Sequence, residues 1–192
     1  MQGNINNFSK PKQWLGVFCG SYSGNDEDIH SLASTLGIAM AKRGIGLIYG
    51  GGGIGIMGTV ADSVLTEGGY VIGVVPENLM ETEMAHQSLS ELIVVKSMHD
   101  RKQTMYKYSD AFCALPGGLG TLEEVFEAAT WTKLGLHRKY KPVLLLDQKE
   151  FWDGLEKVLD EITSAGFIKP QDRAILNRVK TVEQVLSIFD KN

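Results

Sequence analysis

The stretch AFCALPGGLGTLEEVFEAATWTKL, residues 111–134, contains the sequence patterns from which the fold of this chain is predicted. Its first part, Ala111 to Leu115, is a short apolar run bounded by a proline and a glycine cluster, which is typical of a buried strand. From Thr121 to Leu134 the apolar residues recur at helical spacing. The stretch therefore predicts a strand, a glycine turn and the beginning of a helix.

The glycine turn is suited to a bound phosphate, because glycine has no Cβ to block a ligand and a helix start presents unpaired N–H groups with a partial positive charge. We expect a phosphate to be held by the N–H groups of Gly117, Gly118, Gly120 and Thr121. Thr121 is also expected to cap the helix, with Glu124 completing a capping box. Two interpretations of Glu124 remain open: it is only a cap, or it performs acid–base chemistry beside a bound phosphate ester.

The remaining chain alternates apolar runs with segments of helical periodicity. Strands are predicted at residues 14–19, 46–49, 70–75, 92–95, 111–115 and 142–146. Helices are predicted at residues 26–43, from about 58 to 67, and at 98–108, 121–134, 151–165 and 181–189. Because the strands are wholly apolar and alternate with helices, we expect an α/β fold with a parallel sheet covered on both faces.

A second glycine cluster, GGGGIGIMG at residues 50–58, also follows a predicted strand. Ligands of such sheets bind beyond the carboxyl ends of the strands, so both clusters should lie at one edge. Gly52 and Gly53 are expected both to pack a helix against a strand and to approach a ligand. Ser21, at the end of the first predicted strand, is a candidate phosphate contact, although turn formation alone explains a serine there.

The second cluster also contains G-x-G-x-x-G, but it follows the second strand, whereas a dinucleotide loop normally follows the first. A nicotinamide dehydrogenase is therefore a disfavoured hypothesis. A Walker loop is excluded because Thr59 stands where that motif requires lysine.

Length and composition predict one domain over residues 13–192, preceded by a flexible tail at 1–12. The chain has 192 residues and a net charge of −4, which argues against a nucleic-acid partner. No apolar run approaches the roughly 20 residues of a membrane span, and no secretion signal is recognisable. Cys19 and Cys113 lack CxxC spacing and suggest reduced core residues of a cytoplasmic protein, a disulfide being the minority interpretation. No cluster of potential ligands has metal-site spacing, and we expect neither a metal nor a cofactor.

Four segments together resemble the Lonely guy (LOG) family of cytokinin riboside 5′-monophosphate phosphoribohydrolases. They are the cluster at residues 50–58, Met98-His99-Asp100-Arg101-Lys102, the turn at 116–124, and Thr130-Trp131 with Leu134-Gly135. The resemblance covers about residues 14–190, with the motifs in the family's order. It implies a Rossmann-like, doubly wound domain that works as a homodimer or a larger assembly. The family is often labelled lysine decarboxylase, but no lysine here stands in a setting that suggests a pyridoxal phosphate aldimine.

The resemblance implies hydrolysis of the N-glycosidic bond of a purine nucleoside 5′-monophosphate to the free base and ribose 5-phosphate. It also implies that Arg101 and Glu124 are essential. Lys102 would add positive charge for the phosphate; apart from the resemblance, Arg101 and Lys102 are more typical of a solvated helix face. Apolar residues at 79–84 and at Leu122, Val125 and Phe126 are candidates for a dimer contact, or for core.

Two positions depart from the family's usual pattern, namely Lys133 and Tyr22, so the preferred base is open between adenine and N6-modified adenine. The alternative function is a non-catalytic carrier or sensor of a nucleotide or of a molybdenum-cofactor-type pterin nucleotide on the same fold. Such a carrier would not need both Arg101 and Glu124.

Overall fold

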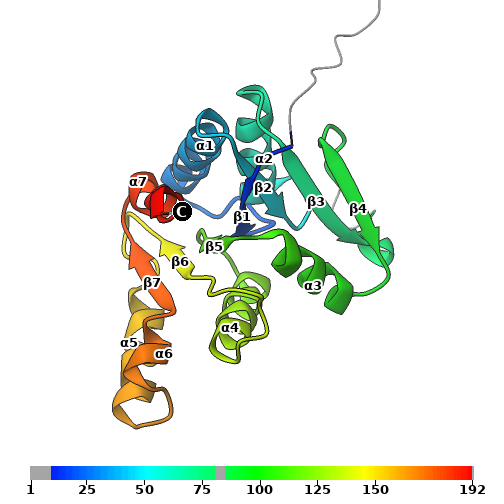
Figure 1. The fold of residues 1–192 in the computed structure, drawn as a ribbon. Coiled ribbons are helices and arrows are strands. Elements are labelled where there is room, and N and C mark those ends of the chain that lie inside the picture. The colour runs from blue at the N-terminus through cyan, green and yellow to red at the C-terminus, as the bar shows by residue number, and fades with distance from the viewer. Residues whose placement is uncertain (1–9, 81–84, 192) are drawn as a thin grey trace, which may run out of the picture.

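One seven-stranded parallel sheet organises the computed structural model, which describes residues 10–80 and 85–191 (Figure 1). The strand order is β4-β3-β2-β1-β5-β6-β7, which confirms the predicted parallel α/β sheet. Residues 1–9 of the expected tail and 81–84 of the expected dimer segment lie outside the described residues. The strands are β1 (Gln13–Phe18), β2 (Ile45–Tyr49), β3 (Val71–Pro76), β4 (Glu91–Val95), β5 (Ala111–Ala114), β6 (Val143–Leu146) and β7 (Leu176–Val179).

Helices connect most successive strands and return the chain to the same edge of the sheet; between β3 and β4 the described residues form only a 3₁₀ turn, and α7 follows the last strand. They are α1 (Glu27–Lys42), α2 (Gly55–Thr66), α3 (Met98–Tyr108), α4 (Leu119–Lys133), α5 (Asp153–Ser164), α6 (Pro170–Arg173) and α7 (Val182–Leu186), with 3₁₀ turns η1 (Glu77–Leu79) and η2 (Ser187–Lys191). None of those in the described ranges combines the length and apolarity needed to cross a membrane.

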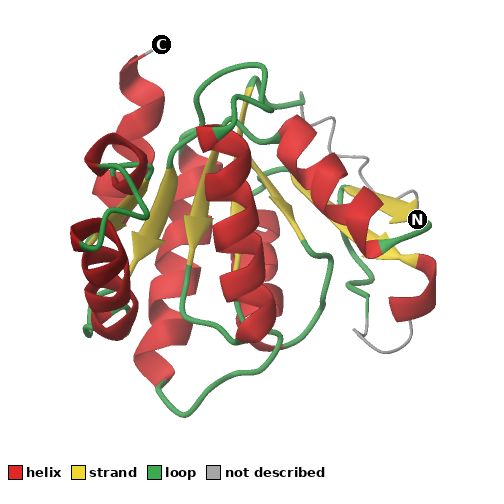
Figure 2. Cartoon of the chain, turned by 90° about the horizontal axis from the view of Figure 1, so that it is seen from below, coloured by secondary structure: helices red, strands yellow, loops and turns green. Residues whose placement is uncertain are grey.

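Helices cover both faces of the sheet and create two cores (Figure 2). Side chains alternate along β1, so Leu15 and Val17 enter the core beneath α1, α2 and α7, while Trp14 and Phe18 enter the core beneath α3, α4 and α5. Cys19 and Cys113 are both buried and free, as expected for core residues.

The position of β1 in the middle of the sheet creates the ligand edge. From β1 the chain adds β2, β3 and β4 on one side, and then crosses over to add β5 directly against the other side of β1, with Val17 paired to Cys113. The loops after β1 and β5 therefore leave the sheet toward opposite faces. Such a switch in direction opens a crevice at the carboxyl ends of the strands.

Two edge strands differ from the sequence-based expectations. β7 was not predicted, because Asn177 and Arg178 interrupt its short apolar pattern. In β4, Leu92 and Val94 are exposed while Ile93 and Val95 pack against the core, so the expectation that the sheet is covered on both faces is wrong at this edge.

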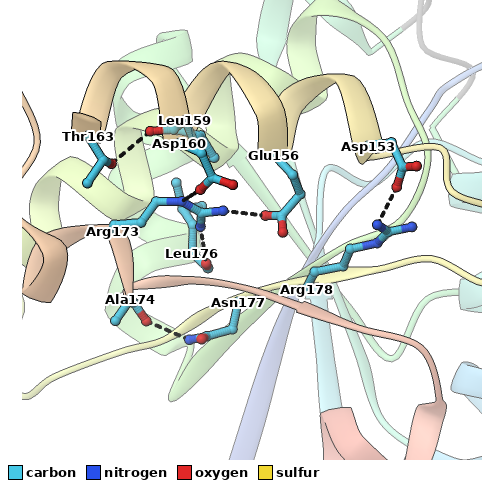
Figure 3. Close-up of polar contacts among 10 residues, drawn as sticks. All are labelled: Asp153, Glu156, Leu159, Asp160, Thr163, Arg173, Ala174, Leu176, Asn177 and Arg178. Carbon is cyan, nitrogen blue, oxygen red and sulfur yellow. Dashed lines mark hydrogen bonds and ion pairs between the residues drawn. The ribbon is translucent and has the colours of Figure 1, made fainter. Parts of the chain in front are cut away.

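Two arginine side chains, Arg173 of α6 and Arg178 of β7, bind carboxylates of α5 (Figure 3). Arg173 donates to Glu156 at 2.8 Å and to Asp160 at 3.0 Å, while Arg178 contacts Asp153 at the start of α5. Arg178 also donates to the buried carboxylate of Asp147, at 3.0 Å. These contacts anchor the turn between β6 and α5.

Asp147 organises that turn from the end of β6. Its carboxylate accepts the N–H groups of Lys149 at 2.7 Å and Trp152 at 3.0 Å. Burial alone would raise the pKa of Asp147, but the N–H groups of Trp152, Lys149 and Phe151 and the charge of Arg178 outweigh it and lower the pKa. The ionised form is therefore the one that stabilises the fold.

Asp147→Asn should lower the free energy of unfolding by about 2–3 kcal/mol at pH 7, because a buried charged partner of Arg178 is lost. A depressed carboxyl pKa stabilises the fold above the unfolded-state value of about 3.9 and loses that contribution as pH falls through the folded-state value. The difference between wild type and variant should thus shrink below about pH 4 in urea unfolding. Asp160→Asn, which removes an exposed partner of Arg173, is the control and should cost less than about 1 kcal/mol. Equal losses in the two variants would contradict this account.

Candidate functional site

A cavity of about 470 Å³ lies at the carboxyl edge of the sheet, where the loops after β1 and β5 diverge. Its walls come from the β1–α1 loop, the β5–α4 turn, α3, α4 and the β6–α5 turn. It brings together most of the residues proposed from the sequence: Ser21, Arg101, Gly117, Gly118, Gly120, Thr121 and Glu124. Gly52, Gly53 and Lys102 do not line it.

The first turn of α4 forms one wall and begins earlier than predicted. The helix starts at Leu119 with Gly118 as N-cap, and no side chain of the described residues caps it. The predicted Thr121 cap and Thr121–Glu124 capping box are therefore wrong, because both residues already lie inside the helix. The first N–H groups of a helix have no partner within it, so this turn offers donors to a ligand in the cavity.

Three glycines of this turn have two different roles. A Cβ on Gly117 would lie 2.1 Å from Thr121 Oγ1 and 2.9 Å from the Gly20 nitrogen, so close packing explains this residue. A Cβ on Gly118 or Gly120 would meet no atom within 4 Å, and neither residue has positive φ. Neither packing nor backbone geometry requires glycine at these two positions, and both face the cavity.

The second glycine cluster supports the site mainly from behind the cavity wall, although Ile56 and Met57 of this cluster line the cavity. Gly55 has φ +61°, and a Cβ there would lie 2.3 Å from the Ser21 carbonyl oxygen. The Gly52 carbonyl accepts the Tyr49 hydroxyl at 3.0 Å, and Met57 N–H donates to the Gly20 carbonyl at 3.3 Å. This cluster therefore packs the β2–α2 loop against the β1–α1 loop. Gly52 and Gly53 do not line the cavity, and both roles expected for them stay predictions.

Arg101 reaches the cavity from α3, whose first turn is capped by Ser97 accepting the Asp100 N–H at 3.1 Å. The Arg101 side chain is buried, and its Nη2 donates to the Gly50 carbonyl at 2.8 Å. A Cβ on Gly50 would lie 2.2 Å from that nitrogen, so any side chain at this position would displace the Arg101 guanidinium from this contact. The alternative of a solvated helix face is wrong for Arg101.

Glu124 faces the same cavity from α4 and is only 8% exposed. Cys19 lines the cavity beside it. Burial raises the pKa of the Cys19 thiol well above its usual range, and the Glu124 carboxylate raises it further. A thiol that stays protonated is a poor nucleophile, so Glu124 and Arg101 are the groups suited to chemistry here.

Lys102 lies beside Arg101 in sequence but points to a different place. Its ammonium contacts Glu123 and lies 2.8 Å from Glu127, both on α4. Both carboxylates therefore engage this lysine, although Glu123 stays largely exposed. Lys102 is thus placed between two carboxylates rather than in the cavity wall.

Sequence reasoning missed several apolar residues of the cavity, among them Ile29, Met98 and Phe151. Phe151 belongs to no recognisable motif. It reaches the cavity because the contacts of Asp147 shape the β6–α5 turn, in which Phe151 lies. The two residues that depart from the family's usual pattern lie in different places. Tyr22 lines the cavity mouth, whereas Lys133 lies at the other end of α4, with its Nζ 3.6 Å from Asp172 Oδ2.

An uncapped helix start beside a buried carboxylate and guanidinium, at the switch point of a parallel sheet, defines a Rossmann-like α/β protein with a site for a small phosphate ester. A family model described as "Possible lysine decarboxylase" matches residues 57–189. In the described ranges, no lysine lines the cavity, so the geometry gives that description no support.

Comparison with known proteins specifies the family. The chain is 45% identical to a probable cytokinin riboside 5′-monophosphate phosphoribohydrolase of Oryza sativa subsp. japonica, over 88% of this chain and 75% of that protein. It is 42% identical to a cytokinin riboside 5′-monophosphate phosphoribohydrolase of Arabidopsis thaliana, over 88% of this chain and 79% of that one. The chain therefore belongs to the LOG family, as its motifs indicated.

Solved structures support the fold independently. The molybdenum cofactor binding protein of Rippkaea orientalis superposes with a TM-score of 0.69 at 22% identity, over 95% of this chain and 98% of that one. At this identity the likeness concerns the fold.

Gly120→Ala should separate stability from ligand binding. Alanine in a helix interior is favoured over glycine by about 0.5–1 kcal/mol, so the variant should be slightly more stable. The added methyl group would occupy the cavity and weaken binding of AMP, used as a phosphate-bearing probe, by roughly tenfold or more. Calorimetry and thermal unfolding measure the two effects.

Gly154→Ala is the matched control, because Gly154 lies in α5 and a Cβ there would also meet no atom within 4 Å. It should stabilise the protein to a similar extent and leave AMP binding unchanged. Unchanged AMP affinity in Gly120→Ala would show that the α4 turn does not hold the phosphate.

Proposed function

We propose that this protein hydrolyses the N-glycosidic bond of purine nucleoside 5′-monophosphates, releasing the free base and ribose 5-phosphate. The observation that carries the proposal is the buried Glu124 carboxylate in the same cavity as the uncapped start of α4. A phosphate at the helix start and a carboxylate further along the helix match the two ends of a ribose 5-phosphate group.

The geometry of α4 supports this assignment. Glu124 lies five positions after the first helical residue, Leu119, which corresponds to a rise of about 7.5 Å along the helix axis. A phosphate bound to the first N–H groups would hold the ribose against the next turn of the helix, where Glu124 lies. Fixing the substrate at its phosphate supplies the orientation that a reaction with water requires.

Cleavage of the N-glycosidic bond determines which chemistry the site must supply. Cleavage passes through an oxocarbenium-like state, in which the ribose becomes positively charged as the bond electrons leave with the base. An ionised Glu124 would stabilise this charge and accept a proton from the water whose oxygen bonds to C1′, while the departing base takes up one proton, so the products are the neutral base and ribose 5-phosphate.

Arg101 supplies the positive partner of the site. Its guanidinium offers a planar set of donors, one of which the Gly50 carbonyl fixes. We assign the guanidinium to binding the substrate's oxygens and to orienting Glu124. Ser21 from the β1–α1 loop, together with Gly118 and Thr121 of the α4 turn, would complete the phosphate contacts.

Glu124→Gln should lower the rate of base release by roughly 100- to 10,000-fold, the usual range for loss of a general base. AMP and N6-isopentenyl-AMP are incubated separately with pure protein, and the free base is measured by chromatography; the ratio of the two rates gives the preferred base. Glu161→Gln, at an exposed position of α5, is the control and should retain full activity. No release from either nucleotide, with both still bound, would favour the carrier function instead.

We also propose that the protein acts as a cytoplasmic homodimer. The buried, free Cys19 and Cys113 suit a reducing compartment. Apolar side chains are exposed on α4 and just beyond it: Leu119, which also lines the cavity, Phe126, Leu134 and Leu136. Exposed apolar side chains that gather on one element are typical of protein interfaces. Val125, a candidate from the sequence, is instead fully buried in the monomer.

Phe126→Glu should convert a dimer to a monomer, because it places a charge within the proposed contact surface. Light scattering coupled to size exclusion measures the mass. Phe167→Glu is the control, since Phe167 is more exposed than Phe126 but lies between α5 and α6. A wild-type protein that is monomeric at all tested concentrations would contradict the proposal.

A further inference from the structure

Lys102 is held in an ionic cluster between α3 and α4. Its ammonium contacts Glu123 and lies 2.8 Å from Glu127 Oε2, and its side chain is only 13% exposed. The same Glu127 oxygen accepts the Tyr106 hydroxyl at 2.7 Å. Lys102 and Tyr106 lie one turn apart on α3, so both bind the Glu127 carboxylate of α4.

The Tyr106 side chain is held in place by the core of the domain. Its ring packs edge-on against Phe18, Phe112 and Trp131, with centroids 6.4, 5.5 and 5.2 Å away. Its carbonyl accepts the ammonium of the buried Lys141 at 2.6 Å. The hydroxyl that reaches Glu127 is therefore fixed by the core of the domain.

The charges of the cluster are stable at neutral pH. Burial would lower the pKa of Lys102, but hydrogen bonds and attraction to Glu123 and Glu127 outweigh it and raise the pKa. Burial and the hydrogen bond to Glu127 raise the pKa of Tyr106, so its hydroxyl remains a donor. The cluster thus consists of one cation and one neutral donor on α3, facing two carboxylates on α4.

This cluster directly adjoins the proposed catalytic pair. Lys102 follows Arg101 in α3, and Glu127 lies one turn after Glu124 in α4. A shift of either helix along or around its axis would change the relation of Arg101 to Glu124, and the Lys102–Glu127–Tyr106 contacts oppose such a shift.

We propose that Lys102, Glu127 and Tyr106 form a clamp that positions Arg101 and Glu124 for catalysis, and that Lys102 does not bind the substrate's phosphate. The proposal rests on the hydrolase function proposed above. It replaces the expectation from the sequence that Lys102 supplies charge to the phosphate. These three are positioning residues, because they act through their neighbours.

The test compares Lys102→Met, Glu127→Gln and the double variant by steady-state base release from AMP, with ribose 5-phosphate as a competitive probe of the phosphate site. Misplacing catalytic groups by about 1 Å can cost 100-fold, so kcat should fall about 10- to 100-fold in each single variant. KM and the inhibition constant of ribose 5-phosphate should change less than about threefold. The double variant should be little worse than either single one, because both break the same clamp.

Three further variants serve as controls. Lys102→Arg keeps the charge and should restore most of kcat. Tyr106→Phe removes only the hydroxyl contact and should lower kcat several-fold. If circular dichroism shows that Lys102→Met does not fold, Tyr106→Phe replaces it in the test. Lys107→Met, at an exposed position of the same helix, should leave kcat unchanged.

Two results would overturn the clamp. If Lys102→Met weakens ribose 5-phosphate at least tenfold while Glu127→Gln does not, Lys102 binds phosphate directly. If kcat is unchanged in the single variants while wild type is active, the cluster does not position the pair. An inactive wild-type protein would instead overturn the proposed function, and the clamp's catalytic role with it.

Discussion

The site depends on the uncapped first turn of α4 being held at the switch point of the sheet. The pairing of β5 against β1 brings the β1–α1 loop and the β5–α4 turn together at one edge. The Gly20 N–H donates to the Pro116 carbonyl at 3.3 Å, and Gly117 leaves room for Thr121 to pack against that loop. Unpaired helix donors therefore face a cavity instead of bulk solvent. With Gly118 and Gly120 leaving that cavity open, the fold itself creates a place for an anion.

The charged groups around this turn are supported by residues that make no direct contribution to chemistry. Gly50 gives Arg101 the space to reach a backbone carbonyl, and the second glycine cluster packs the neighbouring loops together. Asp147 folds the turn that brings Phe151 to the cavity. Burying a guanidinium and a carboxylate is costly unless they are fixed by such contacts, which explains why so much of the ligand edge is built from glycine and buried polar groups.

Much of this arrangement could be predicted from the sequence. Apolar strands alternating with amphipathic helices gave the parallel sheet, and the two glycine clusters located its ligand edge. The boundary of α4 could not be predicted, because glycine at position 120 is a poor helix former and Thr121 with Glu124 mimics a capping box. β7 lacked an apolar pattern, and Phe151 lacked a motif. The placement of Lys102 depends on which side of α3 faces α4, a tertiary relation that the motif around Arg101 does not encode.

The central claim is that the start of α4 holds the phosphate of a nucleoside 5′-monophosphate and places the ribose C1′ next to position 124. A crystal structure of the Glu124→Gln variant with AMP tests it most directly. The account predicts phosphate oxygens within hydrogen-bonding distance of the N–H groups of Leu119, Gly120 and Thr121, with C1′ near the substituted side chain. A phosphate bound elsewhere, or an AMP molecule whose C1′ lies outside the reach of position 124, would contradict it.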